Sequence, residues 1–148
     1  MMLEVFCPGK PVPKQSFRIG GKGRPGWQPK RITQYQKRTA WAVRAAIREQ
    51  GWKILEDNVA VAVSIRFVFP RPVATKKADR DRWAYRVARP DIDNLTKSVL
   101  DSLSQAKVWA DDQQVARIEA EKVLGPRGRE GVWIRVEVIS DEEFREGF

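Results

Sequence analysis

Residues 89–115 of the chain read RPDIDNLTKSVLDSLSQAKVWADDQQV. Two aspartates one residue apart, Asp91 and Asp93, precede a run of apolar residues at helical spacing. The apolar residues of this run are Leu95, Val99, Leu100 and Leu103. Their spacing predicts an amphipathic helix from about Asp93, with Asp93 or Asn94 as its N-cap. Pro90 disfavours a helical Arg89, so we expect Asp91 and Asp93 to point the same way as alternate residues of an extended segment.

A second acidic pair, Asp111 and Asp112, follows this helix after a short apolar piece at residues 108–110. We expect that piece to be a short strand that returns the second pair to the first. Lys97 lies four residues after Asp93, on the same helical face. Carboxylate oxygens are the ligands that Mg²⁺ prefers. The pattern therefore predicts a hard-cation site assembled from two nearby segments.

Each half of this pattern also has a structural interpretation. An Asp-x-Asp before a helix can serve only as a cap, and Asp-Asp is common in turns. The combination of four carboxylates with Lys97 favours the metal site. Asp101, four residues after Lys97, is interpreted instead as a helix-surface partner of that lysine, worth about 0.3 kcal/mol.

Residues 89–103, RPDIDNLTKSVLDSL, followed by VWADDQQV at 108–115, resemble the RusA family of Holliday-junction resolvases, which is common in bacteria and their prophages. The resemblance implies that Asp91, Asp93 and Asp112 are metal-binding catalytic aspartates and that Asp111 assists them. It implies that Lys97 is the essential lysine of the family. A long basic insertion before Arg89 departs from the compact family members and leaves the DNA contacts and sequence preference open.

The same resemblance implies an activity and a fold. The expected activity is that of a magnesium-dependent crossover junction endodeoxyribonuclease, with Mn²⁺ as a substitute metal, which makes paired symmetric nicks in four-way DNA junctions during recombination and repair. The expected fold is α+β, a mixed sheet with two main helices packed on it, in a homodimer. Two opposed cuts in a two-fold symmetric junction also require two symmetrically placed sites.

Composition narrows the chemistry. At 148 residues we expect one domain over residues 1–148. The chain has no histidine, which excludes Ser-His-Asp triads, His-based nucleases and zinc-finger sites. Its one cysteine, Cys7, excludes a disulfide framework and indicates a reducing compartment, which we take to be the cytoplasm. No stretch resembles a signal peptide or a membrane span, and no organic cofactor is expected.

Charge is divided unevenly along the chain. Residues 1–90 hold 20 Lys and Arg against 6 Asp and Glu, and residues 91–148 hold 8 against 13, so the net charges of +14 and −5 sum to +9. A basic half attracts the phosphates of a nucleic acid, while a separate acidic half can hold a cation that promotes cleavage of the phosphodiester bond. Binding to a membrane surface is the competing interpretation, but no basic amphipathic helix with a strongly apolar face stands free for it.

The remaining elements are expected in a simple order. We predict a strand at 3–7, a helix at 33–50 begun by a Thr33–Gln36 capping box and ended by Gly51, a strand at 59–69, and an antiparallel hairpin of 115–124 with 132–139. Basic loops at 8–31 and 70–90 and an acidic tail at 140–148 complete the chain.

The two basic loops supply the predicted DNA contacts, which are Lys14, Gln15, Arg18, Arg71, Lys76, Lys77 and Arg89. Simple solubilising disorder around residues 20–26 is an alternative for the first loop. On the predicted helix at 33–50, Trp41 lies in a line of basic residues and indicates either a DNA or subunit contact or a partly covered surface tryptophan. Two rival functions remain open, a nuclease acting on flaps, forks or RNA and a non-catalytic DNA-binding protein.

Overall fold

The computed structural model describes residues 1–14, 23 and 29–147, and its elements form one five-stranded mixed sheet with two helices. The strands are β1 (Met2–Pro8), β2 (Val61–Pro70), β3 (Ala84–Tyr85), β4 (Val115–Gly125) and β5 (Gly131–Val138), and the helices are α1 (Lys30–Gln50) and α2 (Ile92–Gln105). Short 3-10 turns lie at Lys77–Asp79, Asp112–Gln114 and Asp141–Glu143. The expected α+β class is confirmed.

Strand β2 lies at the centre of the sheet, whose order is β1-β5-β2-β4-β3. It pairs in parallel with β4 and antiparallel with β5. The expected β4–β5 hairpin is therefore wrong, because β2 separates the two strands. The central position of β2 shows in its burial, because Ala62 and Val68 are buried even on the face opposite Val63 and Phe67. Neighbouring strands on both sides help to cover these side chains.

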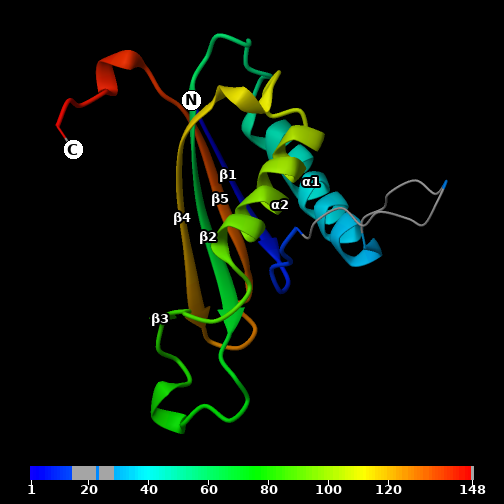
Figure 1. Cartoon of the computed structure of the whole chain (residues 1–148), viewed down its shortest axis with the longest axis vertical. Helices are drawn as coiled ribbons and strands as arrows, with labels where there is room; N and C mark the ends of the chain where they lie inside the picture. The colour runs from blue at the N-terminus through cyan, green and yellow to red at the C-terminus, as the bar shows by residue number, and fades with distance from the viewer. Residues whose placement is uncertain (15–22, 24–28, 148) are drawn as a thin grey trace.

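Both helices cover one face of the sheet, side by side (Figure 1). The core between them and the sheet includes the fully buried Phe67, Phe69, Leu95 and Leu103. Burying a side chain of this size contributes about 1.5–3 kcal/mol. Cys7 is part of this core, as predicted, and its burial raises the pKa of its thiol to about 11. The opposite face of the sheet carries no helix of the described chain.

Helix α1 differs from expectation at its start. It begins at Lys30, with Pro29 as an N-cap that forms no side-chain cap bond, so the predicted Thr33–Gln36 capping box is wrong. Gln36 is instead buried and donates from Nε2 to the Asp101 carboxylate at 3.3 Å. The end of the helix is as predicted, because Gly51 has a left-handed backbone with φ of 69°. Trp41 is 72% exposed on the outer face of α1.

Residues 71–89 form a projection that we call the finger (Figure 1). The sequence predicted only a loop here, but Ala84 and Tyr85 add strand β3 to the edge of β4. The Trp83 ring lies over Gly125, where a Cβ would come within 2.7 Å of the ring. The Arg71 guanidinium donates to the Arg82 carbonyl at 2.9 and 3.1 Å and so closes the base of the finger. Neither helix is long and apolar enough to cross a membrane within the part of the chain that the structure describes.

Candidate active site

Asp91 and Asp93 lie at the start of α2. The helix begins at Ile92, with Asp91 as its N-cap in an extended conformation (φ −68°, ψ 141°), so the two aspartates are not alternate residues of one extended segment. The Asp91 side chain forms no cap hydrogen bond, and neither carboxylate forms an ion pair within the described residues. Both side chains are exposed. The capping interpretation therefore does not account for Asp91.

The backbone on either side of these aspartates is held from three directions. Lys122 on β4 donates from Nζ to the Pro90 carbonyl at 2.8 Å and to the Ala88 carbonyl at 2.9 Å. The Arg86 guanidinium donates to the Arg89 carbonyl. From the other side, the Lys14 backbone N–H donates to the Asn94 carbonyl at 2.9 Å. These bonds fix the point where the chain enters α2, and no sequence pattern indicated Lys122 in this role.

Lys97 lies one turn into α2 and is exposed. The expected pair between Lys97 and Asp101 is wrong, because Asp101 instead accepts a 2.6 Å ion pair from Lys14. Lys14 therefore fastens the segment after β1 to α2, and its ammonium would have to leave Asp101 to contact DNA. Within the described residues, Lys97 forms no ion pair with a carboxylate.

Asp111 and Asp112 lie in a tight turn immediately before β4. Gln114 is 6% exposed and holds this turn: its Oε1 accepts from the backbone N–H groups of Ala110 and Asp111, both at 3.0 Å, and its Nε2 donates to the Glu56 and Val59 carbonyls. The Gln113 backbone N–H donates to the Asp111 carboxylate at 3.1 Å. This bond, with a hydrogen bond to the neighbouring Asp112, lowers the pKa of the Asp111 carboxyl. Asp111 is thus used as a cap, and both aspartates are exposed.

The two acidic pairs lie at opposite ends of α2. This helix has 14 residues, and at 1.5 Å per residue it spans about 21 Å. In the ranges that the structure describes, no three acidic side chains gather into a group that could hold a metal ion. The expectation that one protomer brings Asp112 beside Asp91 and Asp93 is therefore wrong.

Parallel pairing explains this separation. Strand β4 runs parallel to β2, so the chain must return to the starting end of the sheet before it enters β4, and α2 makes that return. Figure 1 shows α2 rising from the end of the sheet near β3 to the opposite end. The expected strand at residues 108–110 is reduced to an isolated bridge between Trp109 and Leu55.

Comparison with known proteins identifies the family. The sequence model described as Endodeoxyribonuclease RusA matches residues 8–137. The chain belongs to the RusA family. A protein of Lactococcus phage r1t named crossover junction endodeoxyribonuclease rusA is 34% identical over 74 residues, which are 50% of this chain and 53% of that protein. A protein of Aquifex aeolicus with the corresponding name is 25% identical over 134 residues, 90% of each chain.

The phage relative is matched over only about half of its length, whereas the Aquifex relative is matched over nearly all of it. The match to the RusA family model includes both acidic pairs, Lys97 and the finger.

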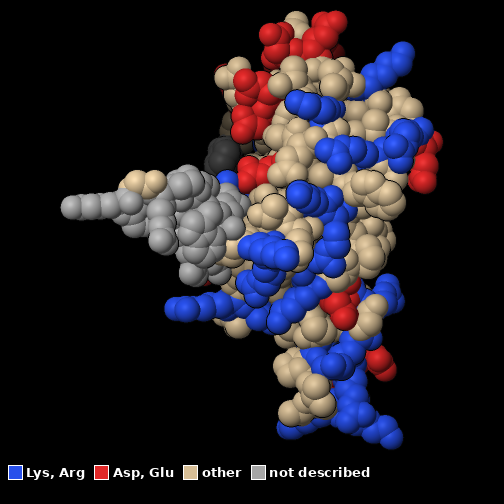
Figure 2. Space-filling view, turned by 90° about the vertical axis from the view of Figure 1, so that its right-hand side faces the viewer, with Lys and Arg blue, Asp and Glu red and all other residues tan. Residues whose placement is uncertain are grey.

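Basic residues surround the end of the molecule where α2 begins. Figure 2 shows Lys and Arg gathered over the lower part of one face and along the finger. Lys76 and Lys77 are exposed on the finger, and Arg89 is exposed two residues before Asp91. The predicted contacts Gln15 and Arg18 lie outside the described residues.

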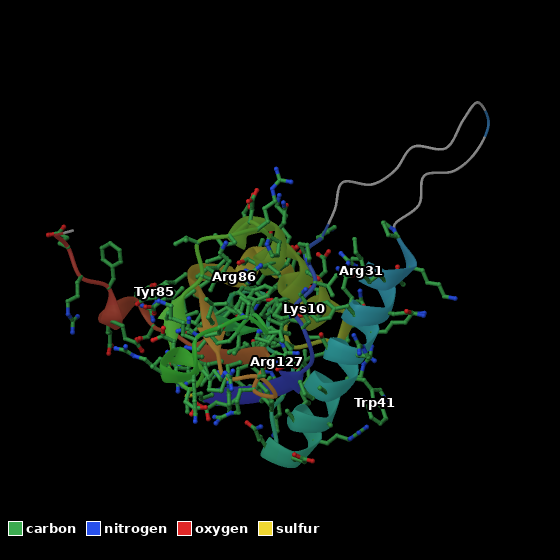
Figure 3. The ribbon with its side chains drawn as sticks, turned by 90° about the horizontal axis from the view of Figure 1, so that it is seen from below. Lys10, Arg31, Trp41, Tyr85, Arg86 and Arg127 are labelled. Atoms are coloured by element: carbon green, nitrogen blue, oxygen red, sulfur yellow. The ribbon has the colours of Figure 1, made fainter. Side chains whose placement is uncertain are left out.

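Three further exposed cations, Lys10, Arg31 and Arg127, were not among the residues predicted individually as DNA contacts. Figure 3, seen from the lower end, shows them with Arg86 on four separate segments of the chain. Lys10, Arg31 and Arg86 fall within the two predicted basic loops, and Arg127, between β4 and β5, extends the basic surface of this RusA-family protein beyond them.

The opposite face of the sheet holds an open hollow of about 580 Å³. Most of its charged lining is already matched, because Arg66 pairs with Glu121, and Arg135 pairs with Glu4 at 2.8 Å, which leaves Glu119 as the lining charge without an ion pair in the described residues. None of the predicted site residues lines it. The hollow is therefore a poor candidate for the catalytic site, and the exposed carboxylates at the ends of α2 fit a hard cation better by donor chemistry.

Proposed function

We propose that this RusA-family chain is a magnesium-dependent endonuclease that resolves four-way DNA junctions by paired symmetric nicks, acting as a homodimer. The observation that carries the proposal is the pair of exposed carboxylates, Asp91 and Asp93, without cation partners in the described chain, at an end of the molecule that is otherwise basic. The names of the two relatives support a junction substrate.

Asp91, Asp93 and Asp112 would hold Mg²⁺, or Mn²⁺ in its place, with Asp111 assisting. When bound, such an ion supplies Lewis-acid activation of a phosphate and of a water molecule. Lys97 lies one turn along α2 from Asp93 and would stabilise the negative charge that develops on the phosphate. Asp111 would be a weaker metal ligand than the other aspartates, because its carboxylate already accepts a hydrogen bond from the Gln113 N–H.

The separation of the acidic pairs supports a site shared between two protomers. In one chain α2 keeps Asp112 away from Asp91 and Asp93, but a two-fold axis perpendicular to α2 would reverse the direction of the second helix. Asp112 of the partner subunit can then complete the site begun by Asp91 and Asp93. One dimer would hold two such sites, as two cuts in a symmetric junction require.

The basic surface would hold the junction by its phosphates. Arg89 lies nearest in sequence to Asp91, and Lys76 and Lys77 extend the surface along the finger. Contacts of this kind give affinity and orientation but little sequence information. We therefore expect recognition to depend mainly on the branched shape of the DNA.

The test of the proposed function is cleavage of a synthetic four-way junction, a replication fork, a flap and a linear duplex by the same preparation, with Mg²⁺ and with EDTA. We expect paired nicks in the junction that require the metal. Equal cleavage of forks or flaps would favour the broader nuclease, and junction binding without cleavage would favour the non-catalytic alternative. Full cleavage in EDTA would show that cleavage does not depend on a metal ion held by these carboxylates.

A mixing experiment tests whether the site is shared. The variants Asp91→Asn and Asp112→Asn should each be inactive alone. In a mixed dimer with shared sites, one site receives both substitutions and the other receives none, so the mixture should nick one strand. If each site lies within one chain, the mixture stays inactive. Mixing Asp91→Asn with Asp93→Asn is the matched control, because both arrangements leave every site damaged.

A further inference from the structure

The outer edge of β4 is free over most of its length. Strand β2 lies on one side of β4, and on the other side β3 pairs only with Val123 and Leu124. No strand of the described chain lies beside residues 115–121 on that outer side. An open edge of this length is a template for pairing with another strand, and proteins usually cover it or use it.

The backbone groups that face outward along this edge can be identified. The Lys122 carbonyl accepts the Arg86 N–H at 3.0 Å, so Lys122 directs its backbone groups towards β3. Successive residues of a strand alternate, and therefore Ile118 and Ala120 direct their N–H and C=O groups to the same outer side. These groups are available for a ladder with a new strand.

The side chains of the free edge are arranged symmetrically about Ile118. Arg117 precedes it, Glu119 follows it, and all three are exposed, Ile118 by 46%. An antiparallel copy centred on Ile118 would place Arg117 opposite the partner's Glu119 and Glu119 opposite the partner's Arg117. The two Ile118 side chains would then face each other on the axis. This sequence is self-complementary in charge and in shape.

We propose that β4 pairs antiparallel with β4 of a second copy of the chain, about a two-fold axis at Ile118. The two sheets become one continuous sheet, and Ile118 forms a pair in which both residues exchange N–H···O=C bonds. The inference rests on the homodimer of the proposed function and adds the surface through which that dimer forms.

This register agrees with the shared site. Residues 115–121 of the two copies fill the free part of the edge, and beyond them β3 occupies the outer side of β4 at Val123 and Leu124. The partner's turn at 112–114 must therefore leave the ladder beside β3 and the segment 86–90 that Lys122 holds. The partner's turn is thereby carried towards the start of α2, where Asp91 lies.

The uncovered face of the sheet is the competing interface, but it is less suited to a second copy. Its central cations are already paired within the chain, Arg66 with Glu121 and Arg135 with Glu4. At the edge of β4, by contrast, Arg117 and Glu119 form no ion pair in the described residues. The charges at the edge are therefore free to pair across an axis.

Charge reversal tests the proposal by sedimentation of the full chain. In a dimer of the Arg117→Glu variant, both copies place a glutamate opposite the partner's Glu119. In a dimer of the Glu119→Arg variant, both copies place an arginine opposite the partner's Arg117. Each variant should weaken dimerisation by roughly tenfold or more. The double variant restores both pairs and should recover the dimer, and mixing the two single variants should give heterodimers in preference. Single variants that dimerise like the parent, or a double variant that does not recover, overturn the proposal.

A second variant separates the interface from general surface effects. Ile118→Lys places two like charges on the axis and should give monomers, whereas Val73→Lys, an equally apolar exposed residue on the finger, should leave the dimer intact. A parent chain that is monomeric overturns the interface even if it cuts junctions. A parent that is dimeric but cuts nothing, with the charge variants behaving as expected, supports the interface while the proposed nuclease fails.

Discussion

The ammonium group of Lys122 lies 2.8 Å from the carbonyl oxygen of Pro90, the residue immediately before Asp91. This bond joins strand β4 to the residue that precedes the first aspartate of the candidate site. Lys122 is partly buried, and it also holds Ala88. The side chain therefore acts on the position of Asp91 rather than on a substrate.

Replacing Lys122 with Met should test this role. Methionine keeps an unbranched side chain but donates to neither carbonyl, so the entry to α2 should loosen and Asp91 should lose its fixed position. Cleavage should fall by roughly tenfold to a hundredfold, as misplacement by about 1 Å can cause. The Mg²⁺ concentration for half-maximal cleavage should rise, and Lys122→Arg should recover part of the activity. A lower melting temperature with an unchanged metal requirement would show that the lysine only stabilises the fold.

Gln114 gives a prediction about stability. Its amide satisfies two backbone N–H groups of the turn that carries Asp111 and Asp112, and two carbonyls of the loop before β2. Gln114→Leu leaves these groups without that partner in a buried site, and the free energy of unfolding should fall by about 2–4 kcal/mol. Urea denaturation measures the change. The control is Gln113→Leu, which alters an exposed side chain next to it and should cost less than about 0.5 kcal/mol. Equal losses in the two variants would contradict the assignment.

The sequence predicted the elements better than their pairing. Alternation identified β1 and β2 and the apolar stripe of α1, because burial on one face leaves a local pattern. The pattern does not say which strands are neighbours. Adjacent alternating segments suggested a β4–β5 hairpin, and only the burial of both faces of β2 indicated that β2 belongs between them.

The composition of the candidate site stays a prediction, whereas its expected arrangement within one chain was wrong. The residues around Asp91 and Asp112 stood out because two acidic pairs occur together with Lys97, although each pair alone also fits a cap or a turn. Their distance apart follows from the parallel pairing of β2 with β4, which no local motif encodes. Lys122 was missed because a lysine in an alternating strand looks like a solvent-facing residue. The role of Gln114 had a signal, since Asp111 followed by a glutamine three residues later fits a capping box.

The two predicted basic segments should differ in their contribution to DNA binding. Lys76 and Lys77 form no ion pair with carboxylates of the described chain, whereas the charge of Lys14 is matched by Asp101 at 2.6 Å. Changing Lys76 and Lys77 to Gln should flatten the dependence of log affinity on log salt by about one unit for each phosphate that the variant no longer neutralises. Lys14→Gln should leave that slope unchanged. Gel-shift titrations with a four-way junction over a series of salt concentrations measure the slope for each variant. A slope that flattens only for Lys14→Gln would show that the DNA contacts the segment after β1 and not the finger.

Substitution of the aspartates should separate binding from chemistry. Asp91→Asn and Asp112→Asn keep the size of the side chain but remove the charge that holds a cation. Because the carboxylates repel phosphate when no metal is bound, junction binding in EDTA should hold steady or tighten. Cleavage should fall by about a thousandfold or more, since a catalytic metal contributes several kcal/mol to the stability of the transition state. Lys97→Ala should also block cleavage, but because it removes a positive charge, binding should stay level or weaken slightly.

Asp101→Asn is the matched control for these variants. It makes the same chemical change on the same helix, but at a carboxylate that is already paired with Lys14, so cleavage should stay close to that of the parent. Gel shifts and single-turnover cleavage on one junction preparation give both quantities for every variant. If Asp91→Asn and Asp112→Asn cut as fast as Asp101→Asn, the two aspartates serve only the helix start and the turn. The enzyme would then need another source of its metal ligands, and the exposed carboxylates at the two ends of α2 would no longer support a nuclease.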